Sequence, residues 1–285
     1  MQTMTNPPDQ LLSDAQKRFF ATFGYLHLPG ILADLIPEVI AGFERIWAAH
    51  GGGHDGKPHD GQARSCLPQF LELDPQMCML LDDARIRGLL VSLLGEDFQY
   101  MGSDGNYYVG DTGWHQDGGD IGITQIKIAF YLDPLDAGNG ALRVIPGSHL
   151  PGGFDDQLKG KFKDSVESLG VTGSQVPAVA LATVPGDLAV FDHRLRHSSW
   201  NGSKRRRMFT MNSCGRWPDH RLGDLQEYIA GGARFLVDSA IAPTMREVAT
   251  PRMRRHLEQA MNNDGLMRQR VAELRAKGTQ AAARG

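Results

Sequence analysis

Residues 113–118 read Gly-Trp-His-Gln-Asp-Gly, so that His115 and Asp117 are separated by one residue. In a β-strand, residues i and i+2 point to the same side, and an H-x-D pair at a strand end directs both side chains at one point. Two imidazoles and one carboxylate are the ligand set of mononuclear non-haem Fe(II) sites, in which other coordination positions stay open. The stretch therefore predicts two metal ligands, and a third must come from a distant strand.

The third ligand is expected to be His197, in the segment Leu-Arg-His-Ser-Ser at residues 195–199. His193 is its competitor, because residues four apart share one face of a helix and the pair could lie on such a face. The alternating pattern around residues 191–199 favours strand geometry instead, and with it His197. Ser199 follows His197 on the same strand face, where its hydroxyl can donate to an anion.

Residues 207–212, Arg-Met-Phe-Thr-Met-Asn, alternate as a β-strand does, with Arg207, Phe209 and Met211 on one face. An arginine on an apolar face is unfavourable unless it meets an anion, and its planar guanidinium suits a carboxylate. The pattern therefore predicts that Arg207 binds a dicarboxylate cosubstrate, whose far carboxylate Ser199 also contacts.

These segments resemble the phytanoyl-CoA dioxygenase family of Fe(II)/2-oxoglutarate oxygenases. The resemblance covers roughly residues 12–215 and also includes residues 12–30, the string Asn-Gly-Ala-Leu-Arg-Val-Ile-Pro-Gly-Ser-His at 139–149, and residues 191–207. It implies that the chain uses Fe(II), 2-oxoglutarate and O2, releases succinate and CO2, and hydroxylates an aliphatic C–H bond of a small molecule. Asp117 stands where related halogenases have a small residue, so halogenation is not expected.

The resemblance also suggests roles for individual residues. Arg207 lies at the family's distance from Asn201, although its distance from His197 is one residue shorter than in some relatives, so Arg206 stays open as an alternative in register. Phe130 falls where an aromatic ring flanks the cosubstrate in similar proteins. Weaker candidates for the cosubstrate pocket are Asn106 and Gln125.

The strand-rich middle of the chain, with turns rich in Gly, Pro, Asn and Asp, predicts a double-stranded β-helix, a cupin-like jelly roll of short antiparallel strands. Helices are expected near residues 13–23, 36–47, 82–94, 251–261 and 266–277. We expect one oxygenase domain over residues 1–285, with a loose tail at 1–11, a glycine-rich loop at 50–62 and a C-terminal helical extension at 245–285.

Composition narrows the range of partners. The formal charge of −3 gives no basic surface for nucleic acid or an anionic membrane, so a small molecule is the expected partner. The three cysteines form no C-x-x-C pair, and no signal peptide or membrane span is seen, so a cytoplasmic protein is expected. The C-terminal helices leave a homo-oligomer possible.

Two other classes of function stay open. A zinc hydrolase or isomerase of the cupin type would use the same His and Asp ligands, and a non-catalytic binding protein could share the scaffold. The primary substrate is not identified by the sequence. Loops at residues 50–73 and 216–239 are expected to contact it, and Arg64, Arg216 and His220 would suit an anionic group, although each is expected to be a surface or structural residue.

Overall fold

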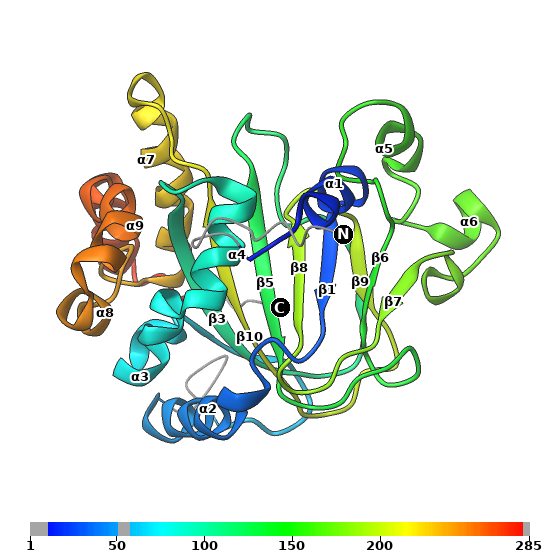
Figure 1. Cartoon of the computed structure of the whole chain (residues 1–285), viewed down its shortest axis with the longest axis horizontal. Coiled ribbons are helices and arrows are strands. Elements are labelled where there is room, and N and C mark those ends of the chain that lie inside the picture. The colour runs from blue at the N-terminus through cyan, green and yellow to red at the C-terminus, as the bar shows by residue number, and fades with distance from the viewer. Residues whose placement is uncertain (1–10, 51–57, 282–285) are drawn as a thin grey trace, which may run out of the picture.

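The computed structural model describes residues 11–50 and 58–281, and its centre is a pair of antiparallel sheets (Figure 1). The larger sheet has the order β1 (Tyr25–Leu28), β8 (Leu188–Asp192), β5 (Gln125–Tyr131), β10 (Arg206–Cys214), β3 (Gln99–Tyr108) and β2 (Ser65–Pro68). The smaller sheet has the order β4 (Thr112–His115), β9 (His197–Ser199), β6 (Leu142–Val144) and β7 (Val179–Leu181). The predicted jelly roll with flanking helices is confirmed.

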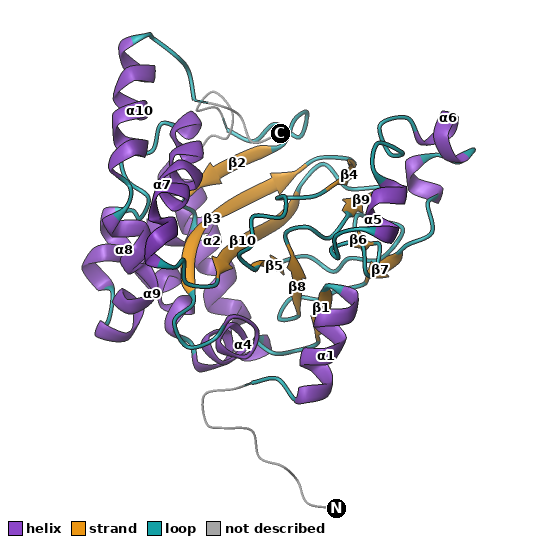
Figure 2. Ribbon diagram, turned by 90° about the horizontal axis from the view of Figure 1, so that it is seen from above, coloured by secondary structure: helices purple, strands orange, loops and turns teal. Residues whose placement is uncertain are grey.

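Helices surround the sheets on three sides, as Figure 2 shows from above. The N-terminal half contributes α1 (Asp14–Phe23), α2 (Ile36–His50), α3 (Pro75–Cys78) and α4 (Ala84–Leu94). Short helices α5 (Gly153–Leu158) and α6 (Ser165–Leu169) lie beyond the smaller sheet. The C-terminal helices α7 (Leu222–Ala230), α8 (Pro243–Val248), α9 (Pro251–Asn262) and α10 (Gly265–Ala276) gather beside β3.

The helix signals in the sequence act as expected. Ser13 forms a capping box with Gln16 at the start of α1, and Gly24 ends that helix at φ 81°, a left-handed conformation that glycine adopts without strain. Thr250 accepts a hydrogen bond from the amide of Met253 at the start of α9. Residues 1–10 of the predicted tail lie outside the described residues. So do residues 51–57, which make up most of the predicted glycine-rich loop.

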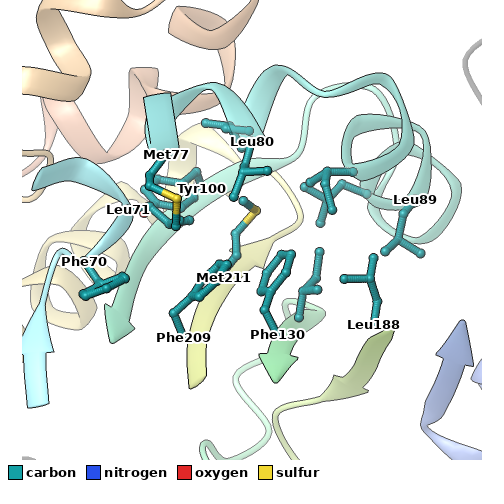
Figure 3. Close-up of a cluster of buried hydrophobic side chains, with 14 of the residues drawn as sticks. Phe70, Leu71, Met77, Leu80, Leu89, Tyr100, Phe130, Leu188, Phe209 and Met211 are labelled. Carbon is teal, nitrogen blue, oxygen red and sulfur yellow. The ribbon is translucent and has the colours of Figure 1, made fainter. Parts of the chain in front are cut away.

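Both faces of the larger sheet carry apolar side chains, and each face packs against a different layer. Phe130 stacks on Phe209 with ring centroids 4.4 Å apart, and both belong with Met211 to the core beneath the N-terminal helices (Figure 3). Their neighbours along the strands, Tyr131 in β5 and Met208 in β10, belong to a second core that faces the smaller sheet. Alternate residues of β5 and β10 therefore point into the space between the two sheets.

A third apolar cluster holds the C-terminal helices to the sheet. Trp217, Leu225 and Met267 are fully or almost fully buried in it, beside Cys214 at the end of β10. The three cysteines are buried, and none of them forms a disulfide. In the part of the chain that the structure describes, no helix is both long and apolar enough to cross a membrane.

Candidate metal centre and cosubstrate pocket

Three predicted ligands meet at the end of the smaller sheet. His115 is the last residue of β4 and lies opposite His197, the first residue of β9. Asp117 follows β4, where its amide donates to the carbonyl of His193 at 2.8 Å. One ligand atom from each of His115, Asp117 and His197 lies within 4.8 Å of the other two, a spacing that could hold one metal ion.

Both imidazoles are oriented for metal binding by their own backbone. Nδ1 of His115 donates to the carbonyl of Gly113, and Nδ1 of His197 donates to that of Leu195, each at 2.8 Å. Because a carbonyl only accepts, the proton is on Nδ1, and Nε2 of each ring keeps its lone pair. Burial lowers the pKa of His197 to about 4, so this ring is neutral at pH 7, as a metal ligand must be.

The carboxylate of Asp117 sits between the histidines and a lysine. Its Oδ2 is 3.5 Å from Nε2 of His197 and 2.8 Å from Nζ of Lys127, and its side chain is 18% exposed. Burial by itself would raise the pKa of Asp117, but the charge of Lys127 outweighs it and holds the pKa well below its usual range. Asp117 is therefore an anion at neutral pH.

His193 is close to the cluster but is not part of it. Its ring is buried beside the side chain of Asn212, and burial lowers its pKa to about 4. Its backbone carbonyl accepts the amides of both Asp117 and Gly118. The structure thus places His197, the ligand favoured by the sequence pattern, with His115 and Asp117. His193 contributes through its backbone carbonyl, which holds the loop at residues 117–118.

Arg206, the alternative in register, faces the space between the sheets. Its Nη1 donates to the carbonyl of Gly140 at 2.8 Å and to Oγ of Ser199 at 2.7 Å, and the residue is only 3% exposed. Its Nε is buried without a partner. A buried guanidinium with an unused donor beside a hydroxyl is a site that fits a carboxylate. Gly140 has φ 104°, and a Cβ there would lie 1.9 Å from Nη1 of Arg206.

Arg207 points to the opposite face of β10, so the prediction that it faces the cosubstrate pocket is wrong. Its guanidinium is bound by two carboxylates, Asp133 at 2.7 Å and Glu44 at 2.9 Å. The face that Arg207 shares with Phe209 and Met211 packs under the helices, and Arg207 meets its anions at the edge of that layer. Arg207 therefore does meet anions, but they are the carboxylates of Asp133 and Glu44 and not a bound cosubstrate.

The other candidates divide in the same way. Ser199 lines the cavity beside Arg206, as expected. Phe130 belongs to the core beneath the helices and cannot flank the pocket (Figure 3). Asn106 is fully buried and accepts from Arg64, and Gln125 lies under Gly118, so neither of these two lines the cavity.

A cavity of about 710 Å³ connects the metal cluster to Arg206. Several of its lining residues were not singled out from the sequence as cavity residues. Lys127 could have been found, because a lysine within the apolar run at residues 125–131 is unfavourable unless it meets an anion, as was argued for Arg207. Tyr131 and Thr210 were also missed. Tyr228, Arg234 and Phe235 fall within residues 216–239, the segment expected to contact the substrate, although none of the three was singled out.

Comparisons with known proteins agree with this architecture. The chain belongs to the phytanoyl-CoA dioxygenase family, whose model matches residues 22–209. Among curated proteins, no sequence matches the chain.

Three solved structures show the same fold. The non-heme alpha-ketoglutarate-dependent carbocyclase SnoK from nogalamycin biosynthesis is 21% identical, with a TM-score of 0.57 over 72% of this chain and 84% of its own. HygX from Streptomyces hygroscopicus with nickel and 2-oxoglutarate bound is 16% identical, with a TM-score of 0.58 over 72% and 88%. EctD from S. alaskensis is 23% identical, with a TM-score of 0.56 over 74% and 80%.

Proposed function

We propose that this chain is an Fe(II)- and 2-oxoglutarate-dependent dioxygenase that uses O2 to hydroxylate an aliphatic C–H bond of a small molecule, releasing succinate and CO2. The observation that carries the proposal is the arrangement of the cavity. Two Nε2 lone pairs and a carboxylate converge at one point of its wall, and a buried guanidinium with an unused Nε lines the same cavity.

The residues present fit both groups. His115, Asp117 and His197 would hold the metal ion, and a set of two imidazoles and one carboxylate with open positions suits Fe(II). Arg206 and Ser199 would hold the far carboxylate of 2-oxoglutarate through charge-assisted hydrogen bonds. When bound, the iron and the 2-oxo acid together activate O2.

The remaining lining gives the reacting region its character. Tyr131, Phe191 and Met208 come from the apolar layer between the sheets, and they border the cavity without adding charge. Such walls exclude water and hold an aliphatic carbon in place. Asp117 fills the position that a halide would need at the metal, which favours hydroxylation over halogenation.

The test is a turnover assay on the purified protein with Fe(II), 2-oxoglutarate and a screen of small molecules. Succinate should form only when iron, 2-oxoglutarate and O2 are all present, and a true substrate should raise the rate. Mass spectrometry under ¹⁸O2 should then find one labelled oxygen in the product. Turnover that persists without O2 or 2-oxoglutarate, or that needs Zn²⁺, would support the hydrolase or isomerase alternative. A ring-closed, epimerised or unlabelled product would overturn hydroxylation alone.

A further inference from the structure

The cavity carries an excess of positive charge that its proposed cofactors do not remove. Its walls hold two carboxylates and four cationic side chains, namely Asp104, Asp117, Arg64, Lys127, Arg206 and Arg234. The difference is +2, in a chain whose formal net charge is −3. A ferrous ion and a doubly charged 2-oxo acid cancel each other, so the same excess stays when both are bound. In a partly enclosed cavity such an excess attracts anions.

Two of the four cations already have a role. Lys127 is paired with Asp117, and Arg206 lies beside Ser199 where a carboxylate fits. The two remaining cations are Arg64 and Arg234, and their surroundings differ.

Arg64 is held in place by a neutral group. Its Nε and Nη2 donate to the side-chain oxygen of Asn106 at 2.9 and 2.7 Å, and its guanidinium lies 4.1 Å above the ring of Tyr108. Oδ1 of Asp104 lies 3.9 Å from Nη2 of Arg64, a long ion pair without a hydrogen bond that balances the charge of Arg64 only in part. An amide oxygen and a ring face orient a guanidinium without cancelling its charge, which leaves Arg64 ready to meet an external anion.

Arg234 lies on the C-terminal wall, which we define as Tyr228, Arg234 and Phe235. It belongs to the short 3-10 segment η7 (Gly231–Phe235), and its guanidinium rests 4.7 Å from the ring of Phe235. Among the described residues, no carboxylate lies within 4.0 Å of it. The C-terminal wall also lines an adjoining cavity of about 340 Å³ and lies beyond the residues that the family model matches.

Apolar surface lies beside these charges. Met101, Tyr228 and Phe235 border both cavities, and Trp114 borders the larger one near the metal cluster. A ligand that fills this space would place an apolar or aromatic body on these side chains and its acidic group near the arginines.

We propose that the primary substrate is an amphipathic organic anion, with an apolar or aromatic body and a carboxylate or phosphate-ester group whose charge is met by Arg64 and Arg234. The inference rests on the proposed function, because it identifies the ligand of the same cavity. Arg234 contributes a determinant that is particular to the C-terminal part of this chain.

The test uses pairs of ligands that differ only in the acidic group. We would measure the binding of 4-phenylbutyrate against 4-phenylbutyramide, and of phenethyl phosphate against phenethyl alcohol, by calorimetry on the purified protein with and without Fe(II) and 2-oxoglutarate under anaerobic conditions. At least one acid should bind about 10-fold or more tightly than its neutral partner. The pair with the larger preference distinguishes a carboxylate from a phosphate ester.

Three variants assign the preference to residues. In Arg234→Gln and in Arg64→Gln the ratio should fall to about threefold or less. It should stay as in the wild type in Arg216→Gln, which removes an exposed arginine paired with Glu258. Arg234 is itself exposed, so its loss does not endanger folding.

Equal binding of acid and neutral partner by the wild type, or an unchanged preference in both Arg234→Gln and Arg64→Gln, would overturn the inference. Failure of the proposed function looks different. A protein that prefers the acids through these arginines, yet forms no succinate under any condition, would retain the anion site and lose the oxygenase assignment.

Discussion

The ammonium group of Lys127 lies 2.8 Å from Oδ2 of Asp117, so a cation from β5 contacts the carboxylate of the candidate metal centre. A positive charge at this position repels a metal ion and attracts an anion bound next to it. At about 5 Å and an effective dielectric constant near 20, the interaction between two unit charges amounts to about 3 kcal/mol before solvent screening, and it doubles for a divalent metal ion. Lys127 therefore has opposite effects on the two cofactors.

We expect Lys127→Met to bind Fe(II) alone at least as tightly as the wild type and 2-oxoglutarate at least about 10-fold more weakly. Anaerobic titration with Fe(II), followed by 2-oxoglutarate, measures both constants. Lys127→Gln keeps a hydrogen-bond donor without the charge and should behave like Lys127→Met. Recovery of wild-type 2-oxoglutarate affinity in Lys127→Gln would show that the hydrogen bond alone matters.

His197→Ala should abolish stoichiometric binding of Fe(II), because it removes one of three converging ligand atoms. His193→Ala is the matched control, since it removes a neighbouring buried imidazole outside the ligand cluster and leaves the backbone carbonyl that holds Asp117 in place. Metal content measured after anaerobic loading compares the two variants. Loss of iron in His193→Ala with retention in His197→Ala would transfer the ligand role.

The two adjacent arginines of β10 should separate function from stability. Arg206→Ala should weaken 2-oxoglutarate binding by roughly 30- to 1000-fold, and Arg206→Lys should restore it only in part because an ammonium lacks the planar fork. Arg207→Ala should leave that affinity unchanged and lower the free energy of unfolding by about 1–2 kcal/mol through the loss of its pairs with Asp133 and Glu44. Calorimetry and urea denaturation measure the two quantities, and the reverse pattern would restore Arg207 as the anchor.

Gly140→Ala should weaken 2-oxoglutarate binding about 10-fold or more while Fe(II) binding stays near that of the wild type. The new Cβ would collide with Nη1 of Arg206 and move it away from Ser199. Gly223→Ala, where the Cβ meets open space, is the control. An unchanged affinity for 2-oxoglutarate in Gly140→Ala would show that the position of Arg206 is not critical.

Glu72 should make stability depend on pH. Burial raises the pKa of Glu72 from 4.5 to about 7, although the amide of Ala242 and the hydroxyl of Tyr100 donate to it. The folded state therefore keeps this proton longer than the unfolded state, so the stability it contributes is present below about pH 4.5 and is lost as the pH rises to about 7.

Relative to Glu72→Gln, the free energy of unfolding of the wild type should fall by up to about 3 kcal/mol over that range. Urea denaturation of both proteins at several pH values measures the difference. A difference that stays constant with pH would show that the pKa of Glu72 is the same in the folded and unfolded protein.

Much of the fold and two of the metal ligands could be predicted from short-range patterns. His115 and Asp117 are two residues apart at the end of β4, and the turns and helix caps are local signals. The arginine could not be assigned in the same way. Alternation tells which residues of β10 share a face, but β10 lies between two apolar layers, with Met208 in one and Phe209 in the other. Only the packing of the sheet decides which face meets the cavity.

The cavity walls were harder to foresee for a related reason. Tyr228 and Arg234 reach the cavity because α7 and η7 pack with α10 over Trp217 and the end of β10. No local pattern within residues 222–235 predicts this packing. Lys127 is different, because a charged residue in the apolar strand β5 was visible in the sequence. Its meaning required the position of Asp117, which is set by long-range pairing of β4 with β9.

The C-terminal wall also matters for protein engineering. The metal cluster and Arg206 lie within residues 22–209, whereas Tyr228, Arg234 and Phe235 come from a later stretch of chain. A combinatorial library restricted to Tyr228, Arg234 and Phe235 would vary this wall without changing a metal-site side chain or the buried residues of α7. Directed evolution from such a library could seek new ligands while the metal centre and Arg206 are kept.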